Sequence, residues 1–322
     1  MWAQQLTGPG TLQPVEVPAP AAGDLRAGEV LVALEHGAIC GSDLPYFRAG
    51  RRAVAAPGRP AGAPPGFPMH EIVGRVRASH DPDVSVGDRV VGWASGEDAL
   101  AELVVTAGAG LHPVSGGNGD RATTVVAQPL ACVMYAVDQL GDVRGKRAAV
   151  LGLGSIGMLF AWVLRQRGAA TVVGVDPVDR TAHAAAFGLD EVLVTGSGPW
   201  SESLDAAGRP DVVVEAVGHQ TATVGDAVRA VADGGTVYCF GIPVREAYPI
   251  DVFTVVRRNL RIVGGVTKDR RAVLGRALAH LRQRPHVATE LVTDIRSGAD
   301  APAAYTAAGT PTAGRLKTVL AL

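Results

Sequence analysis

The sequence predicts an α/β protein in which an antiparallel β domain precedes a doubly wound parallel sheet. From residue 147 onward, short β-branched runs alternate with helical periodicity, as in "RAAVLGLG", "SIGMLFAWVLRQRG" and "TVVGVD". Before that point, strands such as "EIVGRVRAS" are separated by Gly, Pro and Asp turns. Alternating strands and helices are typical of a parallel sheet covered on both faces. Short strands divided by turns are typical of antiparallel sheets.

The composition supports a globular protein of two domains. The 322 residues are enough for two domains, each with its own core. Hydrophobic residues make up 47% of the chain and charged residues 19%, which argues against disorder. The formal net charge of -1 provides no positive field. We therefore expect no nucleic-acid partner.

The cysteines and the N-terminal segment predict a cytoplasmic protein. Cys40, Cys132 and Cys239 are far apart and odd in number, which argues against both a disulfide framework and a structural zinc site. The first ten residues, "MWAQQLTGPG", lack the basic and apolar regions of a signal peptide. The uncharged run 148–164 contains glycines spaced as in a strand, a turn and a helix. We therefore expect no membrane partner.

The domain limits follow from where these patterns change. We expect residues 128–267 to form the parallel-sheet domain. The other domain would combine residues 1–127 with 268–322, because "GRLKTVLAL" reads as a closing strand that rejoins it. Residues 48–68 are rich in Pro, Ala and Gly and predict a loop. Its arginines, which either face an anionic substrate or are solvated, are Arg48, Arg51, Arg52 and Arg59.

A glycine motif in the second domain predicts a dinucleotide site. Gly152, Gly154 and Gly157 have the G-x-G-x-x-G spacing, directly after a strand and at the start of a helix. The first glycine allows the tight turn, the second lets a pyrophosphate approach the backbone, and the third lets helix pack on strand. Ser155 and Ile156 lie between them, where free N–H groups of the helix favour phosphate. Packing glycines in an α/β sheet are the alternative.

Asp176 predicts which dinucleotide binds. It ends the next strand, about 20 residues after the glycines, where a carboxylate accepts hydrogen bonds from the adenosine ribose. The same carboxylate would repel a 2′-phosphate. We therefore expect NAD as the cofactor rather than NADP.

Three further motifs precede the glycine motif: "CGSD" at 40–43, "MHEIVG" at 69–74 and "QPLACV" at 128–133. In this order they resemble the medium-chain dehydrogenase/reductase superfamily, specifically zinc-dependent alcohol and polyol dehydrogenases of the sorbitol and threonine dehydrogenase type. The resemblance covers nearly the whole chain. It implies a GroES-like catalytic domain and a Rossmann domain. It also implies NAD-dependent oxidation of a secondary alcohol (a polyol, sugar or cyclitol) to a ketone, or the reverse, by a homodimer or homotetramer.

The resemblance implies one catalytic zinc. Cys40 and His70 would be its first ligands, because a thiolate and a neutral imidazole suit this ion. Glu71 and Gln128 occupy the other ligand positions of the family. Ser42 would accept the proton of the alcohol, and Asp43 would hold the second nitrogen of His70. The four-cysteine lobe of the family is missing, so we expect no structural zinc.

The resemblance also places residues around the cofactor. Cys132, Val217, Phe240, Gly241 and Ile242 match positions that line or flank the nicotinamide. For Cys132, core packing is an equal alternative. Lys317 matches a basic residue that reaches either the cofactor pyrophosphate or the acid behind the zinc.

Three departures from the family pattern leave other functions open. Gln128 is neutral where the family has Glu or Cys, Pro45 replaces a proton-relaying histidine, and Met69 replaces a glycine. The first alternative is a metal-free reductase of the same superfamily that acts on an activated double bond or a quinone. The second is an NAD-binding protein without catalysis.

Overall fold

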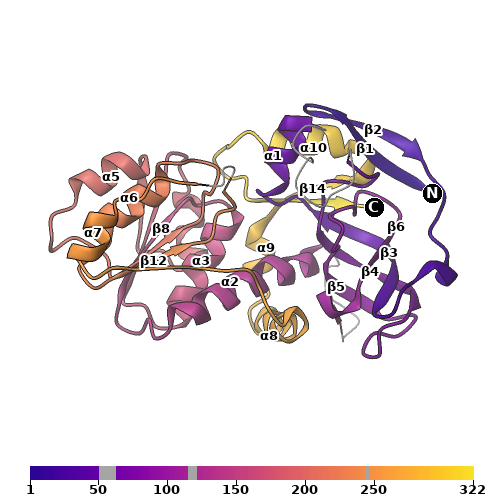
Figure 1. The fold of residues 1–322 in the computed structure, drawn as a ribbon, viewed down its shortest axis with the longest axis horizontal. Helices are drawn as coiled ribbons and strands as arrows, with labels where there is room; N and C mark the ends of the chain where they lie inside the picture. Colours follow the sequence, from indigo (N-terminus) through magenta and orange to yellow (C-terminus); the bar gives the residue numbers. More distant parts are fainter. Residues whose placement is uncertain (51–62, 115–121, 244–246) are drawn as a thin grey trace. The chain divides into compact units, whose positions relative to one another are not determined.

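The computed structural model describes residues 1–50, 63–114, 122–243 and 247–322 (Figure 1). They form two compact units. Unit 1 comprises Met1–Ala131, Asp269–Pro311 and Arg315–Leu322, and unit 2 comprises Cys132–Lys268 with Thr312–Gly314. Among the described residues, no helix has the length and hydropathy that a membrane crossing requires.

Unit 1 is built on a seven-stranded sheet with β3 near its centre. The strand order is β14-β15-β3-β4-β5-β7, and β6 also pairs with β3. The strands are β3 (Glu29–Ala38), β4 (Glu71–Ser79), β5 (Arg89–Trp93), β6 (Leu103–Ala107), β7 (Leu111–Pro113), β14 (Val292–Ser297) and β15 (Lys317–Ala321). β15 pairs antiparallel with β3, which confirms that the "GRLKTVLAL" segment rejoins the first domain. One edge of this otherwise antiparallel sheet differs, because β14 runs parallel to β15.

A hairpin and four helices complete unit 1. The hairpin pairs β1 (Trp2–Gly8) with β2 (Thr11–Glu16). The helices are α1 (Asp43–Ala49), α8 (Arg270–Gln283), α9 (His286–Leu291) and α10 (Ala301–Ala308). Buried apolar side chains from the hairpin, α1, α10, the sheet and the segment before β4 form the main core, which includes Phe67, Ile72 and Tyr305. This core reaches the ends of β3 and β4, because Ile39 and Ile72 belong to it.

Unit 2 is a six-stranded parallel sheet in the order β10-β9-β8-β11-β12-β13. Its strands are β8 (Arg147–Leu151), β9 (Thr171–Asp176), β10 (Glu191–Val194), β11 (Val212–Glu215), β12 (Thr236–Cys239) and β13 (Arg261–Gly264). Its helices are α3 (Ser155–Gln166), α4 (Ala184–Phe187), α5 (Ser197–Ser203), α6 (Thr223–Ala230) and α7 (Val252–Arg257), and α2 (Ala127–Leu140) belongs to both units. In Figure 1, α3 lies on one face of this sheet, and α5, α6 and α7 lie on the other.

This topology confirms the predicted doubly wound α/β class. The chain moves outward from β8 to β10, then returns to β11 on the other side of β8, so the direction of winding changes between β8 and β11. Ligands of such sheets bind outside the carboxyl ends of the strands at this point. A cofactor site is therefore expected at the residues just after β8 and β11.

The predicted loop at 48–68 is only partly described. Residues 43–49 form α1 instead, because Asp43 begins a short helix that buries Phe47. Arg48, in the last turn of α1, donates to the carbonyl oxygen of Gly309. Arg51, Arg52 and Arg59 lie outside the described residues.

Candidate active site

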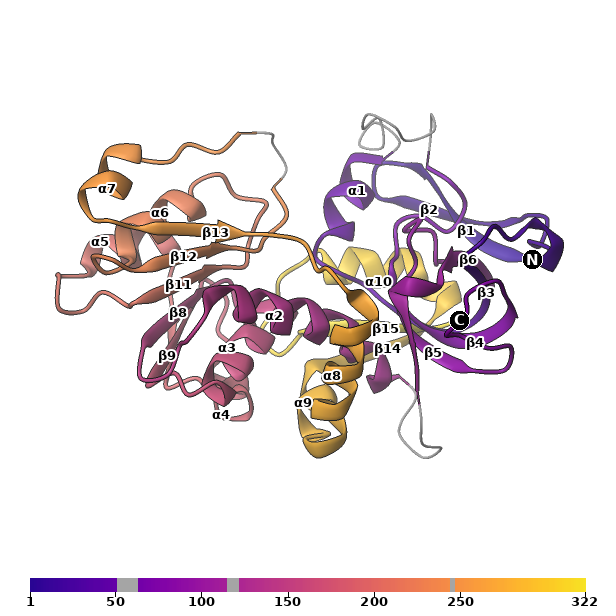
Figure 2. The same ribbon diagram turned by 60° about the horizontal axis from the view of Figure 1, so that its bottom comes forward.

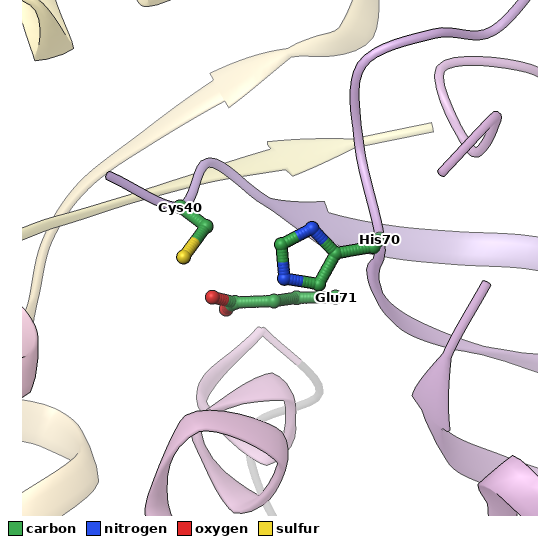
Figure 3. A group of neighbouring side chains, drawn as sticks. All are labelled: Cys40, His70 and Glu71. Carbon is green, nitrogen blue, oxygen red and sulfur yellow. The ribbon is translucent and has the colours of Figure 1, made fainter. Parts of the chain in front are cut away.

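Three potential metal ligands meet at the ends of β3 and β4. Cys40 follows β3 by two residues, Glu71 is the first residue of β4, and His70 immediately precedes it. The antiparallel register pairs Ala38 with Glu71, which brings the two strand ends together. The ligand atoms of Cys40, His70 and Glu71 all lie within 4.8 Å of one another. Figure 3 shows the sulfur, one ring nitrogen and the carboxylate converging on the same space.

The carboxylate of Asp43 orients two of these three residues, His70 and Cys40. Its Oδ1 lies 3.0 Å from Nδ1 of His70, as the sequence resemblance predicts. Its Oδ2 accepts a hydrogen bond of 2.9 Å from the backbone N–H of Cys40. A hydrogen bond at Nδ1 fixes the histidine tautomer and leaves Nε2 as the coordinating atom. One buried carboxylate therefore orients both the imidazole and the turn that carries the thiol.

Lys317 forms a buried ion pair with Glu71. The Nζ of Lys317 donates to Oε1 of Glu71 at 2.6 Å and to the carbonyl oxygen of Ile39 at 3.2 Å. Both side chains are buried, with 1% and 0% of their surfaces exposed. Burial lowers the pKa of Lys317, but the charges of Glu71 and Cys40 outweigh it and raise this pKa above its usual value. Of the two roles that the sequence left open for Lys317, the structure shows contact with the acid.

The remaining oxygen of Glu71 provides a test of whether a metal fits. Oε2 is buried and has no hydrogen-bond partner among the described residues. A buried carboxylate oxygen without a partner is costly unless a cation or another donor compensates it. A thiolate, an imidazole nitrogen and a carboxylate oxygen are the donor types of protein zinc sites. The group therefore fits a zinc ion, with Cys40, His70 and Glu71 as the residues that would hold it.

The surroundings also shift the titration of His70. Burial lowers its pKa, but the charge of Asp43 and the hydrogen bonds to Asp43 and Cys40 raise it well above the usual histidine value. Because a metal binds only the neutral imidazole, this upward shift makes metal binding more favourable as the pH rises.

Tyr305 is a neighbour that the sequence did not indicate. It lies on α10, is fully buried, and its hydroxyl donates to the carbonyl oxygen of Pro68. Burial raises its pKa well above the usual value, and the nearby charges of Asp43, Cys40 and Glu71 add to this. The neutral hydroxyl thus anchors the segment that leads to His70.

Two other predicted residues lie in the same unit. Ser42 is partly buried at the N-terminal end of α1, and its hydroxyl does not cap that helix. Gln128 lies buried in the first turn of α2. Their roles in proton relay and metal ligation remain predictions.

Met69, which departs from the family glycine, is accommodated by a second glycine. Met69 is fully buried. A Cβ placed on Gly37 would lie 2.2 Å from Cε of Met69. The side chain of Met69 therefore occupies the space that any larger residue at position 37 would need.

In unit 2, the three motif glycines differ in the space around them. Gly152 has φ +86°, which favours glycine. A Cβ on Gly157 would lie 1.8 Å from the carbonyl oxygen of Gly152, so this position has no room for a side chain. A Cβ on Gly154 would meet nothing within 4 Å. These are the surroundings that a turn, a phosphate approach and a helix–strand contact require. Ser155 and Ile156 begin α3 beside them.

Substitutions at Gly157 and Gly154 are expected to have different effects. Gly157→Ala should destabilise the fold by about 1–3 kcal/mol, because its Cβ collides with backbone. Gly154→Ala should keep wild-type stability but weaken NADH binding, because its Cβ occupies space left for the pyrophosphate. Thermal unfolding and fluorescence titration with NADH measure the two effects. Equal stability of the two variants would contradict these roles.

Asp176 lies at the carboxyl end of β9 and also braces the glycine turn. Its Oδ2 accepts from the N–H of Leu153 at 2.6 Å, and its Oδ1 accepts from the N–H of Val178 at 2.7 Å. Arg180 is buried nearby and donates to the carbonyl oxygen of Thr312 at 2.7 Å. Burial lowers the pKa of Arg180, and the charge of Asp176 opposes this. No motif in the sequence indicates this role of Arg180.

The predicted nicotinamide neighbours follow the carboxyl ends of β11 and β12. Val217 comes two residues after β11, and Phe240, Gly241 and Ile242 come directly after β12. Ile242 is 58% exposed, and Val217, Phe240 and Gly241 are partly buried. Cys132 is a partly buried thiol on α2. Their contacts with a cofactor remain predictions.

Comparison with known proteins places this chain in a family. The family model "Alcohol dehydrogenase GroES-like domain" matches residues 26–134, and the model "Zinc-binding dehydrogenase" matches residues 155–281. The chain is 31% identical over 307 residues to D-altritol 5-dehydrogenase of Agrobacterium fabrum, covering 84% of this chain and 85% of that protein.

Solved structures show the same fold. An alcohol dehydrogenase from Thermus sp. ATN1 superposes with a TM-score of 0.81 at 22% identity, over 100% of both chains. A protein from Sinorhizobium meliloti 1021, described as a zinc-binding dehydrogenase bound to NADP, gives a TM-score of 0.78 at 25% identity. That match covers 100% of this chain and 99% of the other.

A GroES-like domain that brings a thiol, an imidazole and a carboxylate together, followed in the same chain by a Rossmann domain, defines a dehydrogenase of the zinc-binding class. The chain belongs to the zinc-dependent alcohol and polyol dehydrogenases of the medium-chain dehydrogenase/reductase superfamily, as its motifs predict. It is therefore an alcohol oxidoreductase.

Proposed function

We propose that this protein oxidises a secondary alcohol of a polyol, sugar or cyclitol to a ketone, or catalyses the reverse reduction, with one zinc ion and NAD. The observation that carries the proposal is the convergence of Cys40, His70 and Glu71 within 4.8 Å, with one buried oxygen of Glu71 lacking a hydrogen-bond partner among the described residues. The polyol class is supported by the relative that is named for oxidation of D-altritol.

Each residue of the site has a defined task in this reaction. When bound, zinc would supply a Lewis acid that polarises the substrate oxygen. Cys40, His70 and Glu71 would hold the ion, and Asp43 keeps the imidazole in the tautomer that leaves Nε2 available. Lys317 holds one oxygen of Glu71 and leaves the other available as a ligand. Ser42 would take the proton of the alcohol while passing its own proton on through water or the cofactor ribose, and NAD would accept the hydride from the alcohol carbon. Gln128 is an additional ligand candidate.

Metal content and substrate turnover test this proposal together. Protein purified without chelator should contain about one zinc per chain, and it should reduce NAD with polyols, D-altritol among them. Removal of zinc should abolish this turnover, and added zinc should restore it. Full activity without zinc would instead indicate the metal-free reductase. Cofactor binding without turnover on any alcohol or ketone would indicate a protein without catalysis.

The preference for NAD over NADP rests on Asp176. Asp176→Ala should raise the ratio of kcat/KM for NADP over NAD by about tenfold, because removing its charge removes about 1.4 kcal/mol of repulsion toward a 2′-phosphate. Arg180 then supplies a nearby positive charge. Initial rates with both cofactors measure this ratio.

Asp190→Ala provides the matched control for Asp176. Oδ2 of Asp190 accepts a backbone N–H bond of 2.7 Å from Val172, near the opposite end of β9. This variant should keep the wild-type ratio. An unchanged ratio in the Asp176 variant would refute the assignment of NAD.

We propose further that the protein is a homo-oligomer. β13 pairs only with β12 among the described strands and lies at the edge of its sheet (Figure 2). The neighbouring helix α7 exposes Val252, Phe253 and Val256 by 65%, 74% and 68%. Exposed edge strands and apolar patches are typical of contact surfaces. Light scattering should give twice or four times the chain mass, and a monomer would refute the proposal.

A further inference from the structure

The carboxylate of Glu215 is a buried charged group that the proposed mechanism does not use. Glu215 is the last residue of β11, at the point where the direction of winding changes, and it is 1% exposed. Its register partners are Leu151, at the end of β8, and Cys239, at the end of β12. Glu215 therefore lies between the two loops that follow these strands.

The side chain of Glu215 holds the turn that follows β11. Its Oε1 accepts hydrogen bonds from the N–H of Val217 at 3.0 Å, the N–H of Gly218 at 2.9 Å and the hydroxyl of Thr223 at 2.9 Å. A carboxylate that accepts several hydrogen bonds in a buried position makes stronger bonds than a neutral acceptor. This one oxygen therefore ties the Val217–Gly218 turn to the start of α6.

The backbone of Glu215 holds the loop that follows β12. Its carbonyl oxygen accepts from the N–H of Phe240 at 2.9 Å and from the N–H of Gly241 at 3.1 Å. One residue thus fixes both loops whose members are predicted to flank the nicotinamide.

The held turn also reaches the glycine motif. A Cβ on Gly152 would lie 2.7 Å from Cγ2 of Val217. A Cβ on Gly218 would lie 2.4 Å from the backbone of Gly241 and Ile242. The loops after β8, β11 and β12 therefore touch one another, and a displaced Val217–Gly218 turn would collide with its neighbours.

We propose that Glu215 is a positioning residue for the nicotinamide cofactor. Its carboxylate holds the Val217–Gly218 turn in the position that the nicotinamide half of the dinucleotide requires for binding. This inference rests on the proposed function of unit 2 as a dinucleotide-binding domain. Glu215 acts through the turn and need not touch the cofactor.

The test compares NADH binding in three variants. Glu215→Ala removes the acceptor and should weaken NADH binding at least about tenfold, because three hydrogen bonds to the turn and to α6 are lost. Glu215→Gln keeps an acceptor oxygen of the same reach without the charge and should weaken binding about threefold. Asp211→Ala is the matched control, because Asp211 accepts a backbone N–H bond of 2.8 Å from Arg147 at the opposite end of the same strands. It should leave the Kd for NADH unchanged.

Hydrogen exchange and kinetics separate positioning from a loss of overall stability. In Glu215→Ala, the amides of Val217 and Gly218 should lose protection while those of β8 keep it, and the kcat with NAD should fall together with affinity. If Glu215→Ala does not fold, Glu215→Gln decides, and a wild-type Kd in that variant overturns the proposal. A folded Glu215→Ala with wild-type Kd and kcat also overturns it. Failure of the wild-type protein to bind NADH would instead refute the proposed function of unit 2.

Discussion

A Cys40→Ser variant is expected to lose its zinc and more than about a hundredfold in alcohol turnover while keeping wild-type affinity for NADH. Loss of a residue that only orients a metal ligand costs about 10–100-fold, so loss of a thiolate ligand itself should cost more. Affinity for NADH should persist because the glycine motif belongs to unit 2. Metal analysis, initial rates and fluorescence titration give the three quantities.

Cys239→Ser is the control for that experiment. Cys239 is also a free, partly buried cysteine, but it lies on β12 of unit 2. Its substitution should leave the zinc content unchanged. A Cys40→Ser protein that keeps both zinc and turnover would show that the sulfur is not a ligand, and the proposed site would be wrong.

A Lys317→Met variant is expected to have the largest effect on stability. Removing one partner of a buried ion pair typically costs about 3–5 kcal/mol, because the remaining charge has lost its compensation. Here the remaining charge would be Glu71, which is fully buried. Urea unfolding of zinc-free protein measures this loss. A loss similar to that of Arg144→Met, which breaks an ion pair with Asp142 on the surface, would contradict the argument.

The double variant Glu71→Gln/Lys317→Met tests the origin of that effect. Replacing both members of a buried pair is far less costly than removing one. The double variant should therefore recover most of the stability that Lys317→Met loses. It should still bind zinc more weakly, because the amide carries no charge.

The pH dependence of the Lys317 contribution follows from the direction of its pKa shift. Because the folded state raises this pKa, the stabilisation is complete below the usual lysine value of 10.5 and is lost as the pH rises through the folded-state value. Urea unfolding of the wild-type protein should therefore show no loss of the Lys317 contribution between pH 6 and 9, because the ammonium group keeps its charge over this range.

Much of the fold could be predicted from local patterns. Most strands of unit 2 are runs rich in β-branched residues that end at or near a glycine or an acid. The run and the residue that ends it are close together in sequence, so a local pattern predicts the strand. The structure places these strands as predicted, from β8 to β13. α1 was missed because Pro45 and a neighbouring Pro-rich segment masked a helix of seven residues. β14 was missed because its sequence, "VTDIRS", is short and largely polar and contains no continuous apolar run.

The candidate site could be predicted where a short motif carries it. Cys40, Asp43 and His70 stand in motifs that resemble those of the family, and this resemblance implied the role of Asp43. Tyr305 and Arg180 could not be found in this way, because their contacts, with Pro68 and Thr312, join residues 237 and 132 positions apart. Such contacts depend on how whole elements pack, and no local pattern encodes them.

The ion pair between Lys317 and Glu71 also has a consequence for biosynthesis. Lys317 follows Glu71 by 246 positions, and the whole second unit except Thr312–Gly314 is encoded between Glu71 and β14. In a nascent chain, Glu71 therefore has no Lys317 partner until translation reaches β15. The ion pair behind the metal site can form only after the intervening domain has been synthesised.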